Sequence, residues 1–416
     1  MTPTLSDLIR VFARIGVLSF GGPAAQIALM HREIVDDRKW VTEQEYLSAL
    51  SFCMLLPGPE AMQLATWIGW RKHGTLGGLI AGGLFVLPGA IVVLALSMTY
   101  AAWGQVPVVA ALFTGVQAAV LAVVIEALLR VSKRALKSQT NWIIAIAAFC
   151  ALFLFAVPFP VIILAAGIWG FVKTPTTTAV AATGPAPWRE SLRAALIWGA
   201  IWLLPLAYLQ LIHPGILAEI ALFFSKLAVL TFGGAYAVLT WMTQDVVQQK
   251  GWLTLPQMID GLGLAETTPG PLILVTQFVG YLAAFKEGGV WLGIAGALIT
   301  LWMTFTPCFL WIFAGAPWIS RLTAAPRLAG ALQAITAAVV GVIANLSLWF
   351  GLHVLFAKIS TLRFGPFHLL TPDLTTLNPL ATALAIAAGY LLLWRHWSLP
   401  LVLGMCALTS AAVAAI

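Results

Sequence analysis

The first motif that could bind a ligand is a pair of glycines at a helix break, and it occurs twice. It reads Phe20-Gly21-Gly22-Pro23 near the N-terminus and Phe232-Gly233-Gly234-Ala235 in the second half. Two glycines followed by a proline interrupt a helix, and Pro23 suits the first position of a new helix. Because Ala235 replaces the proline in the second copy, we expect a softer break there.

The second motif is Pro-Gly-Pro, which also occurs twice. It reads Leu56-Pro57-Gly58-Pro59-Glu60 in the first half and Thr268-Pro269-Gly270-Pro271-Leu272 in the second. The two prolines remove two backbone donors and end the preceding helix. A half-helix that starts after Pro59 or Pro271 has free N–H groups and a partial positive charge at its first turn, which favours an anion. The alternative is that both motifs only kink helices or let them pack closely.

Ionisable side chains in apolar stretches are the next candidates. Lys226 and Arg14 each lie six residues before a Phe-Gly-Gly triplet, so each could either hold an anion or extend to the membrane surface. Glu60 and Glu266 lie beside the two Pro-Gly-Pro motifs and could carry a proton or balance charge. We expect Glu126, close to Arg130, to have a structural role.

The composition defines the setting for these residues. Hydrophobic residues make up 61% of the 416 residues and charged residues only 9%, whereas a soluble protein is about 25% charged. This excludes a soluble globular protein, a disordered chain and a nucleic-acid binder with a basic surface. The first residues contain Arg10 and Arg14 and lack a small-residue cleavage site, so they are expected to form a retained helix and not a signal peptide.

A membrane helix needs about 20 mostly apolar residues. By this measure the sequence predicts an all-α polytopic membrane protein with about thirteen transmembrane segments. The predicted segments are 8–30, 44–72, 75–101, 107–131, 140–157, 158–172, 191–212, 215–240, 256–284, 288–314, 326–356, 378–394 and 397–415. The stretch 140–172 could instead be a re-entrant hairpin, because its two parts are short and meet at Pro158 and Pro160.

The distribution of basic residues gives an orientation. With a cytoplasmic N-terminus and alternating segments, most of the 22 Lys and Arg residues fall on the cytoplasmic side, as the positive-inside rule requires. A re-entrant 44–72 would move Arg71 and Lys72 to the other side and weaken this asymmetry. We therefore expect 44–72 to span the membrane.

An internal repeat divides the chain. Residues 12–59 align without a gap to residues 224–271, and the two copies share the Phe-Gly-Gly triplet, Trp40 with Trp252, and Pro-Gly-Pro. In the predicted segment count the copies are an odd number of crossings apart, so they would run in opposite directions. Inverted repeats with broken helices are typical of secondary transporters, whose substrate site lies between the halves. The predicted boundaries are an N-terminal repeat at 1–172, a cytoplasmic linker at 173–190 and a C-terminal repeat at 191–416.

No catalytic constellation is present in the sequence. There is no Walker motif, HExxH, GxSxG or GxGxxG, and the six histidines are scattered. The four cysteines stand alone in apolar runs, so we expect neither a metal site nor a disulfide framework. The sequence therefore predicts neither an enzyme nor a bound cofactor.

These motifs resemble those of the chromate ion transporter family in its long, two-domain form, over nearly the whole chain. The resemblance implies an efflux carrier of the bacterial inner membrane that uses the proton gradient or membrane potential, with sulfate as a similar oxyanion. The residues that match the family signature are Phe20, Gly21, Gly22, Pro23, Trp40, Pro57, Gly58, Pro59, Phe232, Gly233, Gly234, Trp252, Pro269, Gly270 and Pro271.

The leading hypothesis is a secondary active exporter of chromate in the lipid bilayer, conferring chromate resistance. The dianion would be bound by half-helix ends, Lys226 and Arg14, with Glu60 or Glu266 coupling transport to protons. The alternatives are a sulfate or oxyanion importer and a passive anion channel. The sequence allows a homodimer and does not separate chromate from sulfate, since both are tetrahedral dianions.

Overall fold

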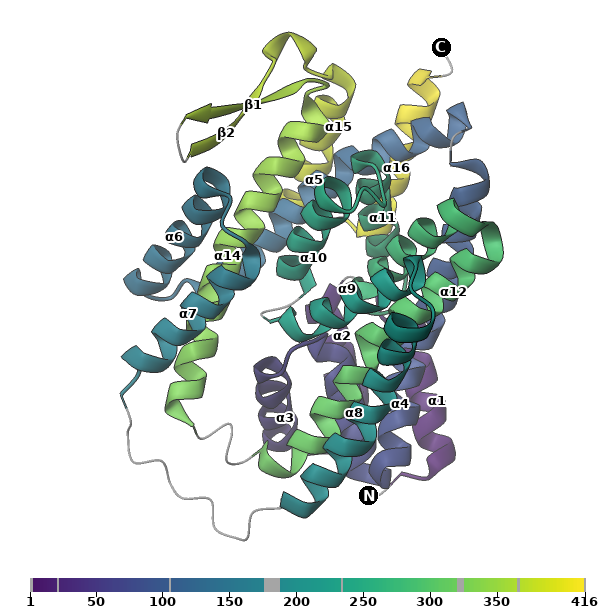
Figure 1. Ribbon diagram of the computed structural model, residues 1–416, viewed down its shortest axis with the longest axis vertical. Coiled ribbons are helices and arrows are strands. Elements are labelled where there is room, and N and C mark those ends of the chain that lie inside the picture. The colour runs from purple at the N-terminus through teal and green to yellow at the C-terminus, as the bar shows by residue number, and fades with distance from the viewer. Residues whose placement is uncertain are drawn as a thin grey trace.

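The computed structural model describes residues 3–20, 22–104, 106–175, 188–232, 235–319, 325–364 and 367–414. They are almost entirely helical, as predicted for a polytopic membrane protein. The exception is a small antiparallel hairpin of β1 (Ile359–Phe364) and β2 (Phe367–Pro372), with Ile359 opposite Pro372. The all-α prediction needs this correction, because the hairpin occupies the polar interval that separates two predicted spans. The hairpin and the N-terminus lie at opposite ends of the long axis (Figure 1).

The first break divides a predicted span into two half-helices. Helix α1 (Leu5–Leu18) ends before the glycine pair and α2 (Gly22–His31) begins after it, continuing into the π-helical η1 (Arg32–Asp37). The chain then turns back beside α1, because Arg14 Nε lies 3.7 Å from Glu33 Oε1. The second repeat matches, with α9 (Ile216–Leu230), α10 (Ala235–Gln244) and η2 (Asp245–Gln249), and Lys250 Nζ lies 3.2 Å from Glu219 Oε2.

The Pro-Gly-Pro motifs form a second pair of re-entrant hairpins. Helix α3 (Glu43–Leu55) leads to the first motif, and α4 (Glu60–Trp103) starts directly after it. Arg71 of α4 lies 3.4 Å from Glu45 at the start of α3, so both ends of this unit are on one side. The prediction that 44–72 crosses in one direction is therefore wrong.

The second repeat has the same re-entrant unit. Helix α11 (Leu255–Thr267) precedes the motif, and η3 (Leu272–Leu274) and α12 (Val275–Gly315) follow it. Lys286 of α12 donates to Gln257 Oε1 at 3.0 Å, near the start of α11. The predicted spans 8–30, 215–240 and 256–284 need the same correction as 44–72. The mean hydropathy of a segment is the same whether the chain runs straight through it or turns back at a break. Hydropathy alone therefore does not detect the turn.

The starts of α3 and α11 show the repeat at the level of single hydrogen bonds. Thr42 accepts from the backbone N–H of Glu45, and Thr254 accepts from that of Gln257. In both cases the side chain at the third helical position returns a contact to the threonine N–H. These capping boxes satisfy backbone groups that a helix start leaves free.

Helices α4 and α12 each bend back on themselves and have two legs. The α4 bend is at His73 and Gly74, and the α12 bend is at Gly288 and Gly289. The second legs, 75–103 and 290–315, pack against each other in antiparallel directions. A β-carbon placed on Gly78 would lie 2.6 Å from Cε1 of Phe313, and one on Gly82 would lie 2.9 Å from Cε1 of Phe309.

Five helices are long and apolar enough to cross a membrane among the described residues. They contain the second legs of α4 and α12, together with α5 (Pro107–Ala135), α8 (Trp188–Ile212) and α14 (Pro326–Leu355). Trp202 is the single buried residue of α8, as expected of a helix that faces lipid. The count of thirteen straight crossings is therefore too high.

The last helices of each repeat pack on the other repeat. Helices α6 (Gln139–Phe155) and α7 (Phe159–Lys173) lie along α14, while α15 (Pro379–Gly389) and α16 (Leu399–Ala414) lie along α5 (Figure 1). The π-helical η6 (Tyr390–Trp394) extends α15. Short 3₁₀ turns η4 (Ala316–Trp318) and η5 (Leu374–Thr376) complete the described elements. The stretch 140–172 thus forms two separate helices, joined through Ala156 in a left-handed conformation.

Candidate functional site

The helix breaks of the two repeats meet through two equivalent hydrogen bonds. The backbone N–H of Gly58 donates to the carbonyl of Thr231 at 2.8 Å, and that of Gly270 donates to the carbonyl of Ser19 at 2.8 Å. Gly58 and Gly270 are equivalent positions in the two repeats, as are Ser19 and Thr231. Each Pro-Gly-Pro motif is thus held by the glycine break of the other repeat, and such reciprocity is the mark of a two-fold relation.

Glycine is required at the centre of each Pro-Gly-Pro motif by the backbone. Gly58 has φ +121 and Gly270 has φ +92, conformations that L side chains rarely adopt. A β-carbon at Gly58 would also lie 2.8 Å from Gln63 Nε2 and 2.9 Å from Cys308 Sγ.

A different glutamine supports each junction. Gln26 is buried and donates through Nε2 to the carbonyl of Gly270 at 2.6 Å, which reinforces the junction at Ser19. The equivalent position in the second repeat is Val238, which has no polar group to offer. The Gly58 junction is supported instead by Gln63, whose Nε2 donates to the carbonyl of Pro57 at 2.7 Å.

A cavity of about 460 Å³ lies beside the Gly58 junction. The start of α2 contributes Pro23 and Ala24, and the start of α4 contributes Glu60. Thr336 of α14 also lines the cavity. Residues at the starts of two helices of the first repeat therefore line the same space.

Four basic residues at the end of α5 line the same cavity: Arg130, Lys133 and Arg134 in the helix, and Lys137 two residues after it. The spacing of Arg130, Lys133 and Arg134 puts these three residues on one face of the last turns of α5. This set was not predicted, because basic residues after an apolar run resemble ordinary loop charge. The i, i+3, i+4, i+7 spacing is the signal that could have identified them.

Glu60 is the only acid among the residues that line this cavity. It interacts electrostatically with Arg134, and its own backbone N–H is a hydrogen-bond partner of its carboxylate. The Arg134 guanidinium lies 3.9 Å from Met54 Sδ on the cavity wall. A carboxylate thus occupies the first turn of α4, where an external anion would find free N–H groups.

The other two predicted cations lie elsewhere. Arg14 is 61% exposed and faces Glu33, and Lys226 is exposed and interacts with Asp245, the equivalent of Glu33. Neither lines the cavity, so the structure does not bring them together with Glu60.

The second Pro-Gly-Pro motif is packed more tightly. The carbonyl of Pro269 contacts Gly89 of α4, and Leu272, which follows Pro271, is buried where the first repeat has Glu60. Glu266 is 8% exposed and lines a second cavity of about 200 Å³. In the first Phe-Gly-Gly motif, Gly22 has φ +78 and begins α2. Gly21 of the same motif, and Gly233 and Gly234 of the second copy, lie outside the described residues.

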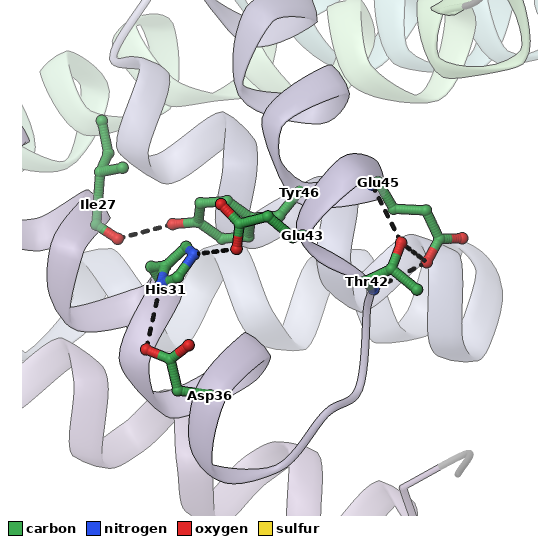
Figure 2. A network of polar contacts seen from close by, with 7 residues as sticks. All are labelled: Ile27, His31, Asp36, Thr42, Glu43, Glu45 and Tyr46. Carbon is green, nitrogen blue, oxygen red and sulfur yellow. Dashed lines mark hydrogen bonds and ion pairs between the residues drawn. The ribbon is translucent and has the colours of Figure 1, made fainter.

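A polar network joins the two hairpins of the first repeat where they end, outside the long crossing helices. His31 Nε2 contacts Glu43 at 2.5 Å and His31 Nδ1 contacts Asp36 at 3.3 Å, while the Tyr46 hydroxyl donates to the carbonyl of Ile27 at 2.6 Å (Figure 2). The hydrogen bond to Glu43 raises the pKa of His31, with further contributions from the charges of Glu43 and Asp36. The network fixes α2 against α3.

The fold and the cavity define a polytopic membrane protein with helix N-termini and basic side chains around an internal space. A family model described as chromate transporter matches residues 6–171 and 218–411. The chain belongs to the chromate transporter family, which makes it a transporter and not an enzyme.

Three similar proteins cover most of the chain. It is 30% identical over 351 residues to the chromate transport protein of Cupriavidus metallidurans, covering 82% of this chain and 81% of that one. It is 34% identical over 344 residues to the chromate transport protein of Pseudomonas aeruginosa, covering 81% and 79%. It is 29% identical over 343 residues to a probable chromate transport protein of Synechococcus elongatus, covering 82% and 83%. No solved structure matches the chain.

Proposed function

We propose that this protein is a secondary active transporter that exports chromate across the bacterial inner membrane and confers chromate resistance. The observation that carries the proposal is the cavity that is lined by the starts of two helices and by four basic residues, three at the end of α5 and Lys137 just after it. Free N–H groups and guanidinium or ammonium groups suit a tetrahedral dianion. Three relatives named as chromate transport proteins support chromate as the substrate.

The proposed site comprises the helix starts at Gly22 and Glu60, the Pro-Gly-Pro bends and the basic face of α5. The exposed Arg14 is assigned instead to its ion pair with Glu33, and Lys226 to its electrostatic interaction with Asp245. Glu60 competes with the anion for the first turn of α4, so anion binding displaces its carboxylate or neutralises it.

The two repeats are proposed to have inverted topology in the membrane. The support is the antiparallel packing of the second legs of α4 and α12, which are equivalent helices. Alternating access would then rock one repeat against the other at the junctions of Gly58 and Gly270. The N-terminus is assigned to the cytoplasm, because Arg38, Arg71 and Lys72 lie at the hairpin ends near it, as the positive-inside rule requires.

Export is favoured over import by two arguments. An inside-negative potential drives a dianion outward by about 4.6 kcal/mol per 100 mV, twice the value for one charge. The two repeats also differ in charge at equivalent positions near the ends of α5 and α14. When α5 and α14 are aligned on their initial prolines, Pro107 and Pro326, the positions equivalent to Arg130, Lys133, Arg134 and Lys137 are Trp349, Leu352, His353 and Phe356. The second repeat therefore has no Lys or Arg at these positions.

Transport into sealed vesicles tests this proposal. We expect full-length protein in proteoliposomes to move labelled chromate in response to an imposed potential or proton gradient, with sulfate as a weak competitor. Sulfate uptake that exceeds chromate transport would favour the oxyanion importer. Flux that depends only on the electrochemical gradient of the anion and never concentrates it would favour a passive channel.

A further inference from the structure

A seam between α5 and α11 leads from the two cavities away from the N-terminal end of the molecule. Arg130 lines both the cavity of about 460 Å³ and the cavity of about 200 Å³, so the two are neighbours. The smaller cavity is also lined by Val123 of α5 and Glu266 of α11. Beyond it the two helices touch, because a β-carbon on Gly263 would lie 2.4 Å from Cγ1 of Val116. The seam is therefore closed directly beyond the smaller cavity.

A buried carboxylate bridges the two repeats at the same seam. Asp260 of α11 is 4% exposed and accepts from the hydroxyl of Tyr100 at 2.7 Å and from Nε2 of Gln117 at 2.8 Å. Both donors are neutral and belong to the first repeat, and no other hydrogen bond or ion pair reaches Asp260 among the described residues. The ring of Tyr100 packs edge-on against Phe113 and Phe278. A carboxylate held only by neutral donors inside the membrane is a functional candidate.

The first repeat has no such bridge at the equivalent place. Ser48 of α3 is the equivalent of Asp260. Gly315 lies as far from the bend of α12 as Tyr100 lies from the bend of α4, and it has no side chain to offer. Ser48 and Ala316 instead line a third cavity, of about 630 Å³, and α3 lies toward the N-terminal end of the molecule (Figure 1). The repeat fold itself thus requires neither a carboxylate nor a tyrosine at these positions.

We propose that Asp260, Tyr100 and Gln117 form the outer gate of the anion pathway, and that the seam between α5 and α11 opens to release the anion. This inference rests on the proposed function and names the residues that close the outward half of the pathway. Because the acceptor and the two donors belong to different repeats, movement of one repeat against the other breaks their hydrogen bonds. In the closed state the carboxylate also opposes re-entry of a dianion, since like charges repel strongly where the dielectric constant is low.

A disulfide across the seam tests the gate in the full-length protein. With Gly263→Cys and Val116→Cys in a background without the four native cysteines, the two β-carbons would lie 3.9 Å apart, as in native disulfides. The second substitution also removes the methyl group that approaches Gly263. We expect oxidation to stop chromate transport in proteoliposomes and reduction to restore it. Val116→Cys alone should transport at the same rate with and without oxidant. Transport that survives complete cross-linking would overturn the gate.

Variants with a weakened gate give a second readout, which decides the question if the disulfide does not form. Tyr100→Phe keeps the ring and removes one hydrogen bond to a charged group, so the passive leak of chromate into sealed vesicles should rise about tenfold. Asp260→Asn keeps the shape, removes the charge and should leak as well. Thr99→Val removes a hydroxyl from an exposed position of the same helix and should behave as wild type.

The outcomes separate this inference from the proposed function. A leak at the wild-type level in both Tyr100→Phe and Asp260→Asn would overturn the gate and leave the proposed function in place. Absence of chromate transport by the wild-type protein would overturn the proposed function as well.

Discussion

The backbone amide of Gly58 donates a hydrogen bond to the carbonyl of Thr231, although the two residues belong to different repeats. The same bond recurs between Gly270 and Ser19. The two bonds place the Pro-Gly-Pro bends and the glycine breaks in one region, and the cavity with the basic face of α5 lies beside the Gly58 bond.

Replacement of Gly58 by alanine should destabilise the protein by about 1–3 kcal/mol, because of its positive φ and the close approach of Gln63 and Cys308. Gly83→Ala is the matched control, since a β-carbon there meets no atom within 4 Å. Thermal unfolding in detergent measures both. Equal melting temperatures for the two variants would contradict the strain argument.

Neutralising Arg134 should lower chromate transport at subsaturating concentration by about tenfold or more, the effect of losing one charge-assisted contact. Lys226→Gln removes an equally exposed positive charge that lies outside the cavity and should retain most of the activity. Initial rates in proteoliposomes compare Arg134→Gln with Lys226→Gln. The reverse order of activities would return Lys226 to the binding site.

Stability should depend on pH through His31. Its folded-state pKa is raised above the ordinary value of 6.5, chiefly by the hydrogen bond to Glu43. The contribution to stability is therefore complete below 6.5 and is lost as the pH rises through the raised pKa. We expect the melting temperature to fall over this interval in the wild type.

Glu43→Gln should flatten that dependence, because it removes the main partner of the protonated imidazole. Glu190→Gln is a suitable control, since Glu190 is exposed and lies outside the network. A wild-type pH profile in Glu43→Gln would contradict the role of the His31 network. Melting curves recorded across neutral pH provide the measurement.

The bends of α4 and α12 should be accessible from opposite sides of the membrane if the repeats are inverted. Thr75 and Glu287 are exposed next to these bends and suit replacement by cysteine, in a background without the four native cysteines. In intact cells a membrane-impermeant thiol reagent should label Glu287→Cys and not Thr75→Cys. Labelling of both from one side would contradict the inverted arrangement.

The sequence predicted the helix breaks, because a helix cannot continue through Gly58 and its flanking prolines. It predicted the repeat because the same motifs recur in the second half. It did not predict that each break turns the chain back, since apolar composition is the same for a straight and a folded segment. The packing of α6 and α7 on α14 was also not predicted, because it depends on contacts between distant parts of the chain. Arg134 lay outside the predicted span 107–131, because the charged end of α5 is not apolar, whereas the helix continues to Ala135.

The reciprocal bonds of Gly58 and Gly270 also have a consequence for biogenesis. When the first repeat has left the ribosome, the amide of Gly58 has no partner, because Thr231 has yet to be synthesised. The membrane-inserted first repeat must therefore keep an unsatisfied polar group until the second repeat arrives, a costly state in lipid. We therefore expect the first repeat to reach its final packing only after the second repeat has been synthesised and inserted.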